Sequence, residues 1–175
     1  VGEDPMLLSE QNADDIGRAN QAVSKASSPV RERITRFDVN WNIIAWPGTQ
    51  WAKRVFPNLE EGEAQKQLAK AIFQASRLEG KDPIENWNLH NKNLRERTNW
   101  LNAKNFAALH FYGEGTDLKV GLADGHEWMG GASKARNGVI CNPNIPSEEV
   151  FTTPHALKVN GYVKSTKPLS HQGTL

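Results

Sequence analysis

Two adjacent carboxylates, Glu148 and Glu149, lie within a proline-rich stretch that covers residues 142–154. Carboxylates held on a stiff backbone can bind a divalent cation or act as a general acid or base. The prolines of this stretch fix φ and disfavour helix around them, so we expect an extended segment. Neighbouring side chains of an extended segment point in opposite directions, so at most one carboxylate of the pair can face a given pocket. Taken alone, the pattern is more typical of an exposed loop without a role.

His126 is a second candidate, because acidic residues and glycines flank it within residues 124–131. A histidine in this setting could be a metal ligand or a substrate contact, and we take it as a candidate substrate-binding residue. The alternative, which the residues alone favour, is a glycine turn in which Trp128 packs.

The other histidines do not suggest a metal centre. We expect His90 on the surface of a helix and His110 on the face of a strand, and His155 and His171 fall in polar loops. A zinc site needs three or four protein ligands, and neither an HExxH nor a CxxC pattern is present. The residues alone therefore assign no catalytic group.

Composition narrows the class of protein. The chain has 175 residues, with 21 Lys and Arg against 20 Asp and Glu, so its net charge of +1 argues against charge-driven binding of nucleic acid or a membrane surface. No apolar run approaches the roughly 20 residues of a membrane span. The single cysteine, Cys141, cannot form an internal disulfide, which fits a reducing compartment and predicts a cytoplasmic protein.

Periodicity predicts the elements that must position these residues. Helical spacing of apolar residues indicates helices at 8–28, 49–55, 60–78 and 83–104. Alternating or β-branched stretches indicate strands at 39–46, 106–112, 117–122, 139–141, 150–151 and 159–164. The fold class is therefore mixed α/β (α+β), with a boundary near residue 105 between a mainly helical part and an antiparallel, β-rich part.

A series of short matches, each weak alone, occurs in one order along the chain and resembles the thermophilic-type metalloaminopeptidases (aminopeptidase T, aminopeptidase S and PepS). The matching stretches are Trp51–Pro57, Ala71–Ala75, Asp82-Pro83 with Trp87 and His90, Leu101-Asn102, Ala108–Phe111, Gly115–Leu118, Gly125-His126 with Trp128 and Gly130-Gly131, Asn142–Pro154 and Ser165–Leu169 with Gly173. They cover the chain from about residue 38, and we expect the resemblance to extend back to residue 8.

The resemblance implies an exopeptidase that removes N-terminal residues from peptides with two divalent cations (Zn, Co, Mn or Mg). Such a pair of cations activates a water molecule and polarises the scissile carbonyl. The family motif implies that Glu149 is a metal ligand, with Glu148 as the fallback. It also implies that residues 1–104 are the C-terminal part of an N-terminal α/β domain, that residues 105–175 begin a catalytic domain, and that the whole protein is a homodimer.

The chain departs from the family in one respect, because the family's further glutamate, histidine and aspartate ligands follow the motif and are not found here. The chain also begins at Val1, and we expect it to be an internal part of a longer protein. A single carboxylate cannot hold two metals, so we expect a metal-dependent aminopeptidase whose residues 1–175 are inactive alone. Two alternatives stay open: a non-catalytic binding or scaffold module, and a carbohydrate-binding protein that uses exposed Trp46 or Trp128.

Overall fold

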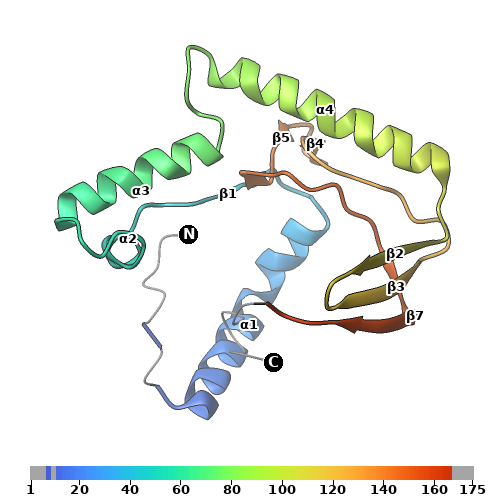
Figure 1. Cartoon of the computed structure of the whole chain (residues 1–175), viewed down its shortest axis with the longest axis horizontal. Coiled ribbons are helices and arrows are strands. Elements are labelled where there is room, and N and C mark those ends of the chain that lie inside the picture. The colour runs from blue at the N-terminus through green and yellow to red at the C-terminus, as the bar shows by residue number, and fades with distance from the viewer. Residues whose placement is uncertain (1–6, 9–10, 167–175) are drawn as a thin grey trace. The chain divides into compact units, whose positions relative to one another are not determined.

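The computed structural model describes residues 7–8 and 11–166, and these form two contact-dense units. Among the described residues, one unit combines residues 7–8 and 11–91 with 131–148, and the other combines residues 92–130 with 149–166. Helices and sheets both occur, which confirms the mixed α/β class, while the division at residue 105 stays a prediction (Figure 1). His171, Gly173 and residues 167–169 of the resemblance, and residues 9–10 of the first expected helix, lie outside the described residues.

Helix α1 (Ala13–Thr35) belongs to the first unit and begins after Asn12, whose side chain accepts a hydrogen bond from the Asp14 amide. The expected end of this helix before Pro29 is wrong, because the helix continues for six residues beyond it. Pro29 has no N–H to donate to the carbonyl of Lys25, four residues earlier. Lys25 is exposed and the helix has no buried residue, so water can satisfy this carbonyl and the helix can continue.

Helices α2 (Thr49–Val55) and α3 (Glu61–Ala75) pack side by side (Figure 1). Ala52, Ala64 and Leu68 are buried between them. The N-cap of α2 is Gly48 rather than Thr49, which lies inside the helix. Helix α3 ends three residues before the expected Leu78.

Helix α4 (Pro83–Lys104) agrees with its sequence prediction at both ends. Asp82 caps it, because its side chain accepts hydrogen bonds from the amides of the second and third helical residues. Its buried residues recur at spacings of three and four and so share one face. They are Trp87, His90, Leu94 and Thr98.

Two short sheets complete the first unit. Strand β1 (Ile43–Ile44) pairs in parallel with β6 (Asn144–Ile145), and β4 (Ser133–Lys134) pairs antiparallel with β5 (Ile140–Cys141). The expected buried strand at 39–46 is wrong, since only two residues pair and their side chains remain 48% and 47% exposed. A two-residue partner offers too little surface to cover a longer strand.

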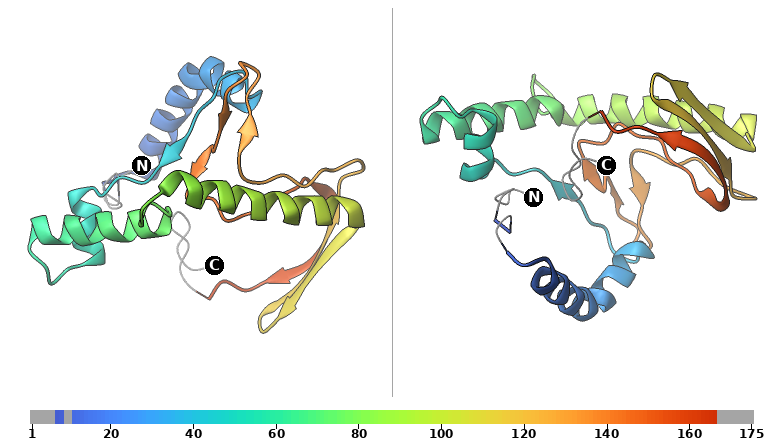
Figure 2. Two further views of the ribbon diagram at one scale, coloured as in Figure 1. Left: turned by 90° about the horizontal axis from the view of Figure 1, so that it is seen from above. Right: turned by 60° about the horizontal axis from the view of Figure 1, so that its bottom comes forward.

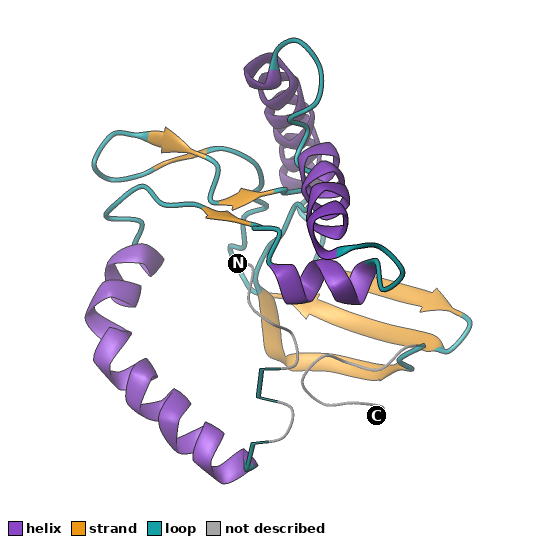
Figure 3. Cartoon of the chain, turned by 90° about the vertical axis from the view of Figure 1, so that its left-hand side faces the viewer, coloured by secondary structure: helices purple, strands orange, loops and turns teal. Residues whose placement is uncertain are grey.

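The second unit contains a three-stranded antiparallel sheet in the order β2–β3–β7 (Figure 3). Its strands are β2 (Ala108–Gly113), β3 (Thr116–Leu122) and β7 (Pro154–Val163). Figure 2 shows the β2–β3 hairpin and β7 from two sides. The expected strand at 150–151 is a single bridge between Met129 and Phe151. No helix among the described residues combines the length and apolarity that crossing a bilayer requires.

Candidate functional site

The segment 142–154 contains no helix, as its prolines predict; it includes the two-residue strand β6 and bends at Pro143 and Pro146, and main-chain bonds hold it at several points. In the first unit, Ile43 N donates to Pro143 O at 2.7 Å beside the β1–β6 pairing. In the second unit, Phe151 and Met129 exchange two hydrogen bonds of 2.8 and 2.9 Å. The chain passes from the first unit to the second between Glu148 and Glu149, so the two carboxylates are fixed by different neighbours.

Glu148 forms a two-pronged ion pair with Arg77. Arg77 Nη2 donates to Glu148 Oε2 at 2.7 Å, and Nη1 donates to the other carboxylate oxygen. Both oxygens of Glu148 therefore face a guanidinium, which is the planar partner that carboxylates match best. The hydrogen bond to Glu148 raises the pKa of Arg77, an effect larger than the opposing desolvation.

His90 binds the main chain of Ser147, the residue before Glu148. The expected place of His90 on the surface is wrong. The imidazole is buried, its Nε2 lies 2.6 Å from Ser147 O, and the edge of Trp87 packs against its ring at 5.5 Å. A carbonyl only accepts hydrogen bonds, so Nε2 carries the proton. The sequence could not show this contact, because Ser147 is 57 residues further along the chain.

Glu149 is exposed and continues the chain into the second unit. Its carbonyl lies so close to Gly130 that a Cβ at position 130 would approach Glu149 O to 2.9 Å. Gly130 is therefore required for this close approach of two backbones. The backbone of Glu149, the candidate metal ligand, is thus held in the second unit by its contact with Gly130.

His126 lies half-buried on a neighbouring segment of the same unit. Ala123 N donates to Thr153 O at 3.0 Å, and Thr152 Oγ1 donates to Glu127 O at 2.7 Å, so two bonds join the segments that carry His126 and Glu149. His126 Nδ1 lies 2.9 Å from Ala123 O and must donate to it. This tautomer leaves Nε2 as the nitrogen able to accept a hydrogen bond or bind a metal.

The donors present fit a metal centre in kind but not in number. Glu149 offers carboxylate oxygens and His126 an imidazole nitrogen, both common ligands of divalent cations. Within residues 7–8 and 11–166, however, no three His, Cys, Asp or Glu residues gather as a metal site requires. His110 and Asp117 form only a pair, at 2.8 Å, on the exposed face of the sheet. The described residues therefore supply single ligands rather than a complete centre.

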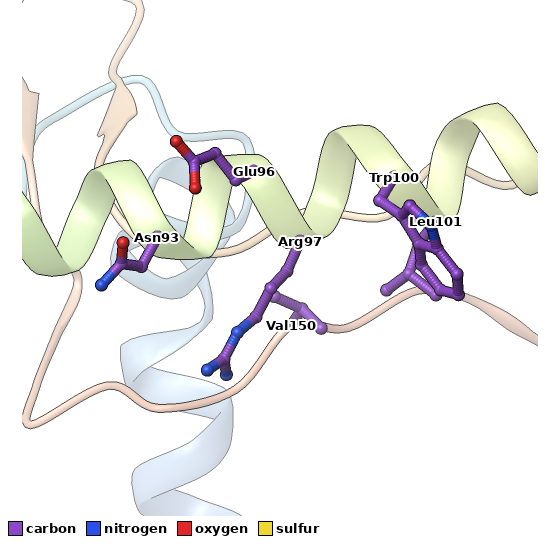
Figure 4. A pocket seen from close by; sticks show the side chains of 6 residues that line it. All are labelled: Asn93, Glu96, Arg97, Trp100, Leu101 and Val150. Atoms are coloured by element: carbon purple, nitrogen blue, oxygen red, sulfur yellow. The ribbon is translucent and has the colours of Figure 1, made fainter.

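A groove of about 520 Å³ lies along α4 in the second unit and was not expected from the sequence (Figure 4). Trp100 and Leu101, which line the groove, are adjacent in the sequence. Two adjacent apolar residues on a helix do not indicate a groove unless the segment that packs against them is known. Its lining residues are Asn93, Glu96, Arg97, Trp100, Leu101 and Val150.

Comparison with known proteins places the chain in a family. The family model described as thermophilic metalloprotease (M29) matches residues 1–175. The chain belongs to this M29 family. The resemblance drawn from the short motifs is thereby confirmed, and the family is one of metal-dependent peptidases.

Characterised relatives of this M29 chain are named as aminopeptidases. Aminopeptidase T of Thermus thermophilus is 49% identical over 174 residues, a match that covers 99% of this chain and 43% of that protein. Aminopeptidase AmpS of Bacillus subtilis is 38% identical over 175 residues and is also covered to 43%. The solved structure of wild-type AmpT from Thermus thermophilus is 47% identical, with a TM-score of 0.86 over 97% of this chain and 41% of that one. The chain thus spans well under half the length of these relatives.

Proposed function

We propose that the whole protein to which this M29 chain belongs is a metal-dependent aminopeptidase that hydrolyses N-terminal residues from peptides. The observation that carries the proposal is the family match over residues 1–175. The names of the relatives at 38–49% identity support the reaction class. Residues 1–175 alone are expected to be inactive, because the described residues do not gather a set of metal ligands.

Glu149 is the metal ligand in this proposal. The ion pair with Arg77 occupies both carboxylate oxygens of Glu148, which disfavours the fallback residue. Two divalent cations, when bound, would activate a water molecule and polarise the scissile carbonyl. Zn, Co, Mn and Mg remain candidate ions, since sites of this kind accept several divalent metals.

His126 is proposed to contact the peptide substrate. Its support is the tautomer set by Ala123 O, which leaves Nε2 able to accept a hydrogen bond from a substrate amine or amide. The hydrogen bonds between residues 123–127 and 152–153 keep this histidine on the segment next to the one that carries Glu149.

A cytoplasmic homodimer is proposed as the working state of the whole protein. The single cysteine supports a reducing compartment, and the dimer follows from the family resemblance alone. Sedimentation of the whole protein at micromolar concentration is expected to give twice the monomer mass, and a monomer would contradict the proposal.

Turnover of aminoacyl chromogenic substrates by the whole protein tests the reaction. We expect a chelator to abolish activity and Zn²⁺, Co²⁺, Mn²⁺ or Mg²⁺ to restore it. Glu149→Gln should lower kcat/KM by at least about 100-fold, the upper end of the losses seen when a group that merely supports a metal ligand is removed.

Two controls accompany this assay. Glu148→Gln should cost less, because that side chain pairs with Arg77 in the structure. Residues 1–175 alone should show no turnover with any of the ions. Chelator-resistant activity of the whole protein would contradict the metal mechanism, and turnover by residues 1–175 that is lost in Glu149→Ala would contradict their inactivity.

A further inference from the structure

The segment that carries His126 is hydrogen-bonded on two opposite sides. On one side, Met129 and Phe151 exchange two main-chain hydrogen bonds, as paired residues of antiparallel strands do. In an extended backbone, the N–H and C=O of the preceding residue, Trp128, point the other way. There they meet the side chain of Asn102, in the last turn of α4.

The carboxamide of Asn102 takes the place of a neighbouring strand. Trp128 N donates to Asn102 Oδ1 at 2.7 Å, and Asn102 Nδ2 donates to Trp128 O at 3.1 Å. These two bonds fix the orientation of the amide, because an N–H must meet its oxygen and a carbonyl must meet its NH₂ group. A carboxylate could not make both bonds, since it only accepts hydrogen bonds.

Trp128 connects this contact to His126. The two ring centroids are 6.5 Å apart and the rings are inclined by 82°, an edge-to-face arrangement that aromatic pairs favour. The indole is buried, and its Nε1 has no hydrogen-bond partner in the part of the chain that the structure describes. Packing and the main chain must therefore place the indole, and Asn102 holds that main chain. The imidazole is held in turn by the indole and, through Nδ1, by Ala123 O.

We propose that Asn102 is a positioning residue, whose carboxamide pairs with the main chain of Trp128 and thereby holds the His126 ring where Nε2 contacts the peptide substrate. The proposal rests on the substrate contact proposed above for His126. All the residues involved belong to the second unit, so the positioning acts within one contact-dense unit.

Asn102→Asp in the whole protein tests the contact itself. The substitution is nearly isosteric, but it replaces the NH₂ donor by an oxygen that faces Trp128 O. We expect the amide hydrogens of His126, Trp128 and Met129 to exchange at least about fivefold faster than in the wild type, because a partly buried carbonyl loses its donor. Asn102→Ala removes both bonds without adding this repulsion. It should accelerate the same exchange, and it replaces the aspartate variant if that variant does not fold.

Asn91→Asp is the matched control on the same helix. Asn91 Oδ1 accepts a hydrogen bond from Ala132 N at 2.9 Å, and an aspartate can accept the same bond. The control should therefore leave both the exchange of residues 126–129 and the KM at wild-type values. Equal acceleration of Trp128 exchange in the two variants would overturn the proposal, because added charge rather than a lost donor would then be the cause.

Steady-state kinetics of the whole protein separate positioning from a merely structural role. Asn102→Asp should raise the KM for a peptide substrate at least about fivefold with kcat within about twofold of the wild type, the pattern of lost ground-state binding. His126→Ala should raise KM by at least as much. In the double variant, Asn102→Asp should add no further increase, because it acts through His126. Increases in KM that multiply in the double variant would overturn the proposal.

The same kinetics distinguish the positioning role from the proposals on which it rests. A wild-type KM in Asn102→Asp, alongside a raised KM in His126→Ala, would overturn the role of Asn102 and leave the substrate contact standing. A wild-type KM in His126→Ala would overturn both the substrate contact and its positioning, whereas chelator-sensitive turnover would still support the metal-dependent peptidase.

Discussion

Gly161 shows how strictly a single residue can be specified in this sheet. It lies on β7 opposite Leu118 of β3 with φ of +120°. A Cβ at this position would fall against the backbone of Asp117 and Leu118, which cannot move aside as a flexible side chain would. The positive φ adds a second penalty for any residue with a side chain.

Gly161→Ala is therefore expected to lower the free energy of unfolding by at least about 2 kcal/mol, measured by urea denaturation of residues 1–175. Gly113→Ala is the matched control, because a Cβ on this other sheet glycine has no neighbour within 4 Å. The control should stay within about 0.5 kcal/mol of the wild type. Equal losses in the two variants would contradict the steric explanation.

The partners of Glu148 and Glu149 could not be predicted from the sequence. Alternation along an extended segment predicts that Glu148 and Glu149 point apart, but it cannot say which one is engaged. The deciding partner, Arg77, is 71 residues away in the sequence and binds Glu148. His90 was misjudged for the same reason, since a helical histidine shows its burial only once its partner segment is placed.

Capping gives a prediction at the scale of one element. Asp82 Oδ1 accepts hydrogen bonds from Ile84 N and Glu85 N, both at 3.0 Å, at the start of α4. Asp82→Ala should lower the free energy of unfolding by about 1 kcal/mol, because it removes this cap. Glu60 occupies the same position before α3 without a side-chain bond, so Glu60→Ala should cost only a few tenths of a kcal/mol. Denaturant titration checks both, and a larger loss in Glu60→Ala would contradict the assignment.

Elements with a repeating signal were predictable, whereas elements defined by their partners were not. The cap and proline at 82–83 predict the start of α4, and the spacing of apolar residues predicts α2 and most of α3. Strands β4 and β6 have two residues each, too few to show an alternating pattern. Pro29 misled the prediction of α1, because a proline removes only one hydrogen bond and an exposed helix can lose that bond to water and continue.

The first contact-dense unit needs residues from both halves of the chain. Residues 131–148 supply β6, the Ser147 carbonyl bound by His90, and the Arg136 amide that donates to Phe37 O at 2.8 Å. A chain of residues 1–104 lacks all three contacts. We therefore expect it to lose the near-ultraviolet circular dichroism of its buried Trp87 and to unfold without a cooperative transition.

A chain of residues 1–148 is the control for that truncation. It keeps every residue of the first unit, so it should retain the Trp87 signal and a cooperative transition. Residues 1–104 that unfold as cooperatively as residues 1–148 would contradict this dependence. The sequence-based division at residue 105 concerns the whole protein and stays a prediction.

For the molecule as a whole, the family could be predicted from the sequence, whereas the metal centre could not. Ordered short matches pointed to the peptidase family that the M29 match then confirmed. The centre could not be assembled, since the described residues bring no three ligands together and the chain covers 43% of its aminopeptidase T relative.

Cys141 on β5 offers a spectroscopic handle on the acidic segment. It is the one cysteine of the chain, it is half-buried, and residues 142–154 begin immediately after it. A thiol-reactive fluorophore or spin label would therefore attach at one position without any engineered cysteine. The order of the segment held by Arg77 could then be followed in residues 1–175 by fluorescence anisotropy while denaturant is added.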